Sequence, residues 1–237
     1  MTSASDPLAG LDPFDIFDTE ATRLDRYFSS LDEKAWNRPS RCEGWSVRDV
    51  LAHLAGEELY NHACLDGDIE GFFEMLEREG VRGGFVDFNE WCVRKRHGLP
   101  VEQVLQEWRD KNAETRERMR ALGRDATLGT SAGPYPVGLQ TFHYDSEYAT
   151  HADDVGAPVG DEEAAARVEW RVEVGLFALA ERGSDVQVER VGRQLRVRVN
   201  SATVDLSPAD FIEATVSRLP AEHPLDRHVR SALRCLA

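Results

Sequence analysis

Four long segments with helical periodicity fill most of the first two thirds of the chain. Apolar residues recur in them at intervals of three and four, which predicts amphipathic helices that each bury one face. The segments cover about residues 15–31, 47–65, 100–123 and 139–155. Four helices of this length joined by loops are typical of an antiparallel bundle.

The second of these helices has the most complete start signal. Ser46 is a good N-cap residue, and Asp49 three positions later can return the hydrogen bond to the cap. Trp45 and Val50 occupy the two positions of a hydrophobic staple. We therefore expect this helix to begin at Val47.

Two further regions complete the chain. Residues 66–99 contain helical stretches near 69–79 and 85–96, and this segment can cap the bundle or cover a pocket. After Pro158 the pattern changes to a helix followed by short alternating segments, which predicts an α+β unit with an antiparallel hairpin. The elements expected there are a helix at 162–182, strands VQVERV, LRVRV and 203–206, and helices at 209–219 and 225–236.

The predicted fold class is therefore α+β and mainly helical. Residues 1–157 are expected to form the four-helix bundle, and residues 158–237 the small α+β domain. At 237 residues with 41% hydrophobic composition, the chain is long enough to bury a core in each.

Composition excludes several classes of function. The formal net charge of −15 and the presence of three lysines make nucleic acid a poor partner. No apolar run is long enough to span a membrane, and the N-terminus lacks the pattern of a signal peptide, so a cytoplasmic location is expected. The four cysteines form no CxxC pair, which favours reduced thiols over a zinc ribbon or a disulfide framework.

His53 lies on the flank of the apolar stripe of the second helix. Glu57, Tyr60 and Cys64 follow it on the same flank at helical spacing. These groups can ligate a metal or hydrogen-bond a ligand beside an apolar surface. A single histidine in such a position is more often structural, so a functional interpretation needs a partner elsewhere in the chain.

The fourth long helix supplies that partner. Within FHYDSEYATHADD, His143, Glu147 and His151 recur every four residues and so leave the same helix face. Two side chains one helical turn apart can bind the same metal ion. Ion pairing or exposure to solvent can also explain any one of these three residues taken alone. Combined with His53 the pattern favours metal binding, because helical bundles build metal sites from facing helices.

At this point the sequence resembles a known family. GWSVRDVLAHL, residues 44–54, is similar to the GWTVRDVVAHL-type signature of the DinB-like, mycothiol-dependent maleylpyruvate isomerase family. EYATH, residues 147–151, falls where that family has its second metal-binding element, and the order of bundle and small α+β domain is also similar. The resemblance implies that His53, Glu147 and His151 hold Zn²⁺ or another divalent metal.

The resemblance also implies a chemistry. Three protein ligands leave zinc an open position, as in catalytic sites, and the family places there the sulfur of mycothiol or a similar low-molecular-weight thiol. Zinc favours the thiolate, which would attack an electrophilic small molecule in a cis-trans isomerisation or an S-transfer. The expected protein is thus an isomerase or transferase acting on a small electrophile, as a monomer or homodimer.

Other polar residues are candidates for supporting roles. Those expected to orient a ligand or line the pocket are His143, Asp154, Glu57 and Tyr60. His143 is also an alternative ligand in place of Glu147. An anionic substrate would require an arginine, and the possible sources are Arg94, Arg96 and Arg218.

Two competing hypotheses remain open at this stage. The chain can be a metal-binding or ligand-sequestering bundle without catalysis, in which a fourth ligand such as His143 closes the site. It can also be a metal-free bundle whose histidines pack or face solvent. The coordination sphere of the metal distinguishes the enzyme from these two alternatives, because an enzyme keeps one coordination position open beside a cavity.

Overall fold

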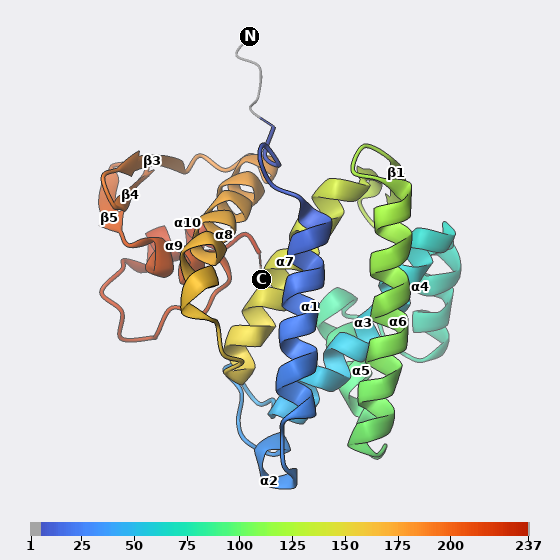
Figure 1. Cartoon of the computed structure of the whole chain (residues 1–237). Coiled ribbons are helices and arrows are strands. Elements are labelled where there is room, and N and C mark those ends of the chain that lie inside the picture. The colour runs from blue at the N-terminus through green and yellow to red at the C-terminus, as the bar shows by residue number, and fades with distance from the viewer. Residues whose placement is uncertain (1–5, 237) are drawn as a thin grey trace. The chain divides into compact units, whose positions relative to one another are not determined.

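The structure, a computed structural model, describes residues 6–236 and is mainly helical, with two small antiparallel sheets (Figure 1). The helices are α1 (Pro13–Ser29), α2 (Glu33–Trp36), α3 (Val47–Asp66), α4 (Ile69–Arg78), α5 (Gly84–Arg96), α6 (Val101–Leu122), α7 (Val137–Val155), α8 (Asp161–Glu181), α9 (Pro208–Thr215) and α10 (Arg227–Leu233). The strands are β1 (Thr127–Thr130), β2 (Gly133–Pro136), β3 (Gln187–Val191), β4 (Gln194–Val199) and β5 (Ala202–Leu206).

Contacts along the described chain define two compact units. One contains residues 12–158, and the other contains residues 6–11 together with 159–236. The predicted division into two domains at residue 157 stays a prediction. None of the helices in the described part of the chain combines the length and the apolar character needed to cross a membrane.

The four predicted long helices are confirmed as α1, α3, α6 and α7, with ends that differ from the predicted ones by at most two residues. In this unit α1 packs against α7 and α3 against α6, and Figure 1 shows the four helices side by side. Their apolar faces meet in one core. Its fully buried large side chains include Phe17, Leu24, Leu54, Trp108 and Tyr148.

The predicted start of α3 is confirmed in its details. The Ser46 side chain accepts a hydrogen bond from the Asp49 amide, and the Asp49 carboxylate accepts one from the Ser46 amide at 2.9 Å. This capping box satisfies two amide groups that a helix start leaves without partners. It fixes the start of the helix at Val47. The side chains one and two turns further along α3, including that of His53, therefore point in a fixed direction.

A glycine lets α5 approach α3 closely. A Cβ built on Gly56 would lie 2.3 Å from the Cβ of Cys92, far inside van der Waals contact. The segment between the second and third long helices, α4 and α5, is thus packed against the bundle through a position where only glycine fits. This contact places the aromatic residues of α5 beside α3.

Two elements of the bundle unit were not predicted. They are the short helix α2 and the hairpin of β1 and β2, in which Thr127 pairs with Pro136 and Thr130 with Gly133. The strands TLGT and GPYP are four residues long and contain glycine and proline, so they lack the alternation that signals a strand. The hairpin leads directly into α7.

The other unit confirms the predicted hairpin and third strand as the antiparallel sheet β3-β4-β5. Val197 of β4 pairs with Val188 on one side and Val204 on the other, and the buried face of β4 packs with Phe211 of α9. The last two helices are shorter than predicted. The chain leaves α10 because the amides of Cys235 and Leu236 bond to the carbonyl of Thr215 instead of continuing a helix.

Candidate metal centre

Helices α3 and α7 bring His53, Glu147 and His151 together. Nε2 of His53 lies 3.3 Å from Oε1 of Glu147, across 94 residues of sequence. Nε2 of His151 lies 3.9 Å from the same oxygen, and the two imidazole rings are 4.9 Å apart between centroids. One ligand atom from each residue falls within 4.8 Å of the others.

The helix geometry explains this convergence. Glu147 and His151 are one turn apart on α7 and therefore leave the same face, which is turned toward α3. Both histidines are buried, with residue exposures of 2% for His53 and 8% for His151. The Glu147 side chain is 31% exposed, so the cluster is accessible to solvent on its carboxylate side.

The charge states of His53 and Glu147 suit metal binding. Burial raises the pKa of the Glu147 carboxyl, but hydrogen bonds with His53 and Glu57 and the nearby His151 outweigh it and lower that pKa to about 2. Burial lowers the pKa of His53 more than its hydrogen bond to Glu147 raises it. The cluster therefore offers a carboxylate and a neutral imidazole, the forms that bind metal ions.

Asp154 and Cys42 surround the other nitrogen of His151. Nδ1 of His151 lies 3.2 Å from Oδ2 of Asp154 and 3.8 Å from Sγ of Cys42, and the Cys42 thiol donates to the same carboxylate oxygen at 3.1 Å. Burial lowers the pKa of His151, but the hydrogen bonds with Asp154 and Cys42 outweigh it and raise that pKa to about 10. Asp154 thus lies where the predicted role of orienting a ligand requires it.

Glu57 lies at the edge of the cluster, one turn after His53. Its Oε2 is 3.9 Å from Nε2 of His53, and its carboxyl hydrogen-bonds to Glu147. Burial and the adjacent Glu147 charge raise the pKa of Glu57 well above its usual range. Of the two carboxyl groups, Glu57 is therefore the one that holds a proton more firmly.

Tyr60 and His143 lie away from the three candidate ligands. The Tyr60 hydroxyl is 3.0 Å from Oγ of Ser131 and accepts the Ser131 amide at 3.1 Å, which ties α3 to the hairpin of β1 and β2. Nε2 of His143 lies 3.3 Å from the Tyr135 hydroxyl. Among the described residues, His143 belongs to neither group of potential metal ligands.

The three candidate arginines differ in their surroundings. Arg96 is buried, donates to the Glu107 carboxylate at 2.7 and 3.0 Å and bonds to the Cys92 carbonyl, so its guanidinium holds α5 and α6 together. Arg94 is exposed on α5. Arg218 belongs to the other unit and donates to the Val216 carbonyl.

The donor set fits a zinc ion. Two imidazole nitrogens and one carboxylate oxygen are typical zinc ligands, and tetrahedral coordination places such atoms roughly 3.3–3.5 Å apart. The 3.3 Å separation between His53 and Glu147 already meets this requirement. The 3.9 Å separation of His151 requires a shift of about half an ångström, which a side-chain rotation supplies.

A second group of potential ligands shares His151. Cys42, His151 and Asp154 also have ligand atoms within 4.8 Å of one another, through Nδ1 of the histidine instead of Nε2. The backbone explains the position of Cys42, because the Arg41 amide donates to the Asp154 carbonyl at 3.0 Å. This bond fastens the loop before α3 to the C-terminal end of α7.

Sequence reasoning missed two neighbours of the cluster, Cys42 and Trp45. The Trp45 ring is 5.2 Å from the His53 ring, and its Nε1 donates to Glu90 of α5 at 2.9 Å. The sequence marks Trp45 only as part of a helix staple and Cys42 only as one of four scattered cysteines. Both lie in a loop, where no periodicity relates a side chain to a distant helix.

The comparisons with known proteins concern the family and the fold. The mycothiol maleylpyruvate isomerase N-terminal domain family matches residues 17–156. A solved structure of a mycothiol-dependent maleylpyruvate isomerase, a mutant with one histidine replaced by alanine, is similar with a TM-score of 0.50 and 15% identity, over 71% of this chain and 67% of that one. The search of curated proteins found no match.

The structural likeness concerns the fold alone at this level of identity. The family match covers more than half of the chain, including α3 and α7, which carry the cluster, as well as α6 and most of α1. The chain therefore belongs to the mycothiol maleylpyruvate isomerase N-terminal domain family, as the resemblance of its two motifs predicts.

Proposed function

We propose that this protein is a zinc-dependent enzyme that uses mycothiol or a similar low-molecular-weight thiol to isomerise an electrophilic small molecule, or to join the whole thiol to that molecule through its sulfur. The observation that carries the proposal is the convergence of His53, Glu147 and His151 from two bundle helices. Family membership supports it, because the family is named for an isomerase of this kind.

The arrangement is that of an open site. Three protein ligands are characteristic of catalytic zinc, whereas structural zinc is usually held by four. A zinc ion bound there would supply a positive charge that favours the thiolate form of an added thiol at neutral pH. The exposed side of Glu147 is the route by which a small thiol would reach the cluster.

The chain's own residues have distinct tasks in this proposal. Asp154 accepts a hydrogen bond from Nδ1 of His151 and so directs Nε2 toward Glu147. Glu57 holds a proton at the edge of the cluster, where a substrate oxygen or carbon that gains negative charge would lie. Trp45 covers the His53 ring and limits access of water on that side.

One observation favours a second candidate, a metal-binding or ligand-sequestering bundle without catalysis. Oε2 of Glu57 lies 3.9 Å from Nε2 of His53, as far as His151 lies from Glu147. If Glu57 lost its proton and joined the three ligands, four protein ligands would close the site. Glu57, and not His143, is thus the residue on which the choice between the two functions depends.

The first experiment measures zinc by elemental analysis in protein purified without added metal. The variants are His53→Ala and His151→Ala, with His62→Ala as the control. His62 lies on α3 as well, and its Nε2 is 3.1 Å from the Lys111 carbonyl, outside the cluster. We expect about one zinc per chain in the wild type and the control, and loss of zinc in the other two.

The second experiment follows thiol consumption and cis-trans conversion with a panel of electrophiles. Zinc-loaded wild-type protein should accelerate one of these reactions, and His53→Ala should not. Zinc binding with no thiol-dependent reaction in either wild-type or Glu57→Gln protein would favour the non-catalytic bundle. Wild-type protein that stays zinc-free after zinc is supplied would contradict both candidates.

A further inference from the structure

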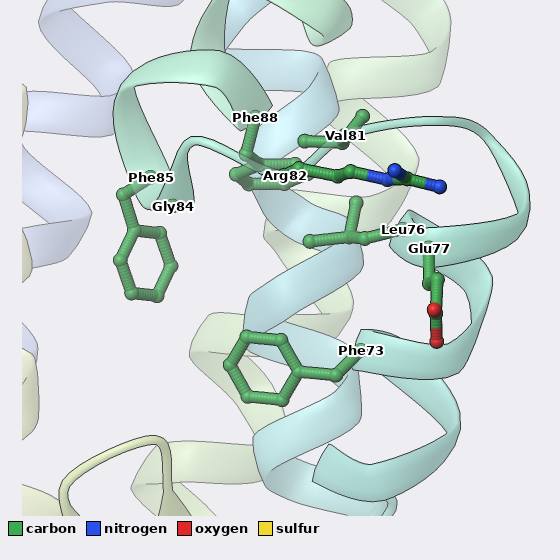
Figure 2. Close-up of a pocket in the computed structure, with 8 residues that line it drawn as sticks. All are labelled: Phe73, Leu76, Glu77, Val81, Arg82, Gly84, Phe85 and Phe88. Atoms are coloured by element: carbon green, nitrogen blue, oxygen red, sulfur yellow. The ribbon is translucent and has the colours of Figure 1, made fainter.

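A pocket of about 530 Å³ lies between α4 and α5, apart from the metal cluster. Its walls are mainly apolar, as Figure 2 shows. The apolar lining residues are Phe73, Leu76, Val81, Phe85 and Phe88. This volume is in the range of pockets that hold small molecules, and so is the combination of an apolar wall with few polar groups.

Aromatic side chains are left partly exposed around this pocket. Phe73 is 44% exposed and Phe85 is 45% exposed, and Figure 2 shows both rings on the same side of the pocket. Val86, the next residue of α5, is 74% exposed. Apolar groups gathered at one place on a surface mark a binding site more often than singly scattered ones do.

Tyr60 packs against the pocket wall and lies on the same helix as His53. Its ring packs edge-on against Phe85, with 5.1 Å between centroids, and against Phe72, with 5.4 Å. His53, Glu57 and Tyr60 share one stripe of α3, at spacings of four and three residues. Seven residues of helix separate His53 from Tyr60 by about 10 Å along the axis.

The charged groups of the pocket do not select an anion. Arg82 and Glu77 both contribute to its lining, so the wall carries one positive and one negative side chain. A small dicarboxylate gains little from such a wall, because the carboxylate of Glu77 opposes it. An uncharged apolar group gains from contact with the aromatic rings, because this contact removes apolar surface from water.

We propose that the pocket between α4 and α5 binds the uncharged, ring-bearing end of an elongated electrophilic substrate whose reactive carbon lies at the metal cluster. Tyr60, which packs against Phe85 of the pocket wall, is about 10 Å along α3 from His53. This inference rests on the proposed function and names its class of substrate. It assigns Phe73 and Phe85 the role of selecting substrates by their apolar end.

The first test is binding of the neutral fluorescent probe N-phenyl-1-naphthylamine. It compares wild-type protein with the double variant Phe73→Ala/Phe85→Ala, in which both substituted side chains are partly exposed and their loss spares the core. Leu122→Ala is the control, because Leu122 is 49% exposed on α6 and does not line the pocket. We expect affinity to fall roughly tenfold or more in the double variant and to stay unchanged in the control.

The second test compares two enones that share one reactive carbon. One carries a methyl group and the other a biphenyl group, and the readout is the ratio of their kcat/KM values with the thiol. We expect the wild-type protein to prefer the biphenyl enone by roughly tenfold or more, and the double variant to lose that preference mainly through KM. The methyl enone serves as the internal control, because it is too short to reach the pocket.

The outcomes separate this proposal from the proposed function. If the wild-type protein and the double variant both turn over the two enones with equal kcat/KM, the pocket does not select the substrate. The thiol-dependent function is then still supported. Absence of turnover for both overturns the proposed function and with it the substrate role of the pocket. If the double variant binds the fluorescent probe as tightly as the wild type does, Phe73 and Phe85 do not select the apolar end of the substrate.

Discussion

Nδ1 of His151 lies 3.2 Å from Oδ2 of Asp154, which is almost fully buried one turn further along α7. A carboxylate can only accept, so the imidazole donates from Nδ1 and presents Nε2 to Glu147. One hydrogen bond thus selects which nitrogen faces the metal cluster. This relationship leads to the first prediction.

Asp154→Asn should weaken zinc binding without abolishing it. Loss of the carboxylate that orients a metal-ligating histidine typically reduces affinity about 10- to 100-fold. Competition with a chelator of known affinity measures the change. Asp110→Asn, an exposed residue of α6 with the same change of charge, is the control. An affinity equal in both variants would contradict the orienting role of Asp154.

Cys42→Ala should keep about one zinc per chain, whereas His53→Ala should lose it. The reason is that the two groups of potential ligands share only His151, so each of the other residues reports on one group. Elemental analysis of the two variants decides between the groups. Loss of zinc in Cys42→Ala with retention in His53→Ala would place the metal between Cys42, His151 and Asp154.

Zinc binding at pH 7.5 should release about one proton for each ion bound. The pKa of His151 is raised to about 10 in the metal-free protein, so the imidazole is protonated at this pH and must lose a proton to bind through Nε2. Zinc affinity should therefore rise with pH between 6 and 9. Calorimetry in buffers of different ionisation enthalpy measures the number of protons.

The same measurement reports on Glu57. If Glu57 joined the ligands it would also lose its proton, and the release would rise to about two, falling to about one in Glu57→Gln. If Glu57→Gln and wild-type protein release the same number of protons for each zinc ion bound, Glu57 is not a ligand and the site is open. No release of protons at all would contradict the raised pKa of His151.

Glu58→Leu should destabilise the bundle strongly. This fully buried carboxylate of α3 accepts from the Asn112 amide at 2.9 Å, the Thr115 hydroxyl at 2.6 Å and the Tyr148 hydroxyl at 3.0 Å. Leucine would leave these buried donors unpaired, at a cost of about 3 kcal/mol or more in the free energy of unfolding. Urea denaturation measures it, with the exposed Glu117→Leu of α6 as the control.

Gly56→Ala should destabilise the protein by about 1–3 kcal/mol, because the new Cβ would meet the Cβ of Cys92 at 2.3 Å. The two helices must then separate, since neither Cβ can rotate away. Gly98→Ala has no atom within 4 Å of its new Cβ and is the control. Addition of Cys92→Gly should recover part of the loss. A neutral Gly56→Ala would show that α5 does not need this close approach.

Prediction from sequence succeeded where the signal is local. The start of α3 depends on Ser46 and Asp49, which are three residues apart, and the four long helices depend on periodicity within each segment. His53, Glu147 and His151 were named as ligands because the two motifs resemble a family, and the structure brings their side chains together. Their role in binding metal stays a prediction.

Prediction failed where the signal comes from tertiary contact. The strands β1 and β2 are too short and too rich in glycine and proline to show alternation, and they form by pairing with each other beside α3. Cys42 approaches His151 because one backbone bond from Arg41 fastens its loop to α7. The close approach of α5 to α3 requires Gly56, and the sequence alone does not show that Cys92 faces this glycine.

The amino-acid sequence by itself determined the helices, their capping and the faces on which His53, Glu147 and His151 lie, because these follow from contacts within one or two helical turns. Only the tertiary structure decided which groups meet across those faces. It paired Glu57 with Glu147, set Asp154 and Cys42 beside the far nitrogen of His151, and formed an aromatic pocket between α4 and α5. The physical reason is that packing joins residues whose separation along the chain carries no periodic signal.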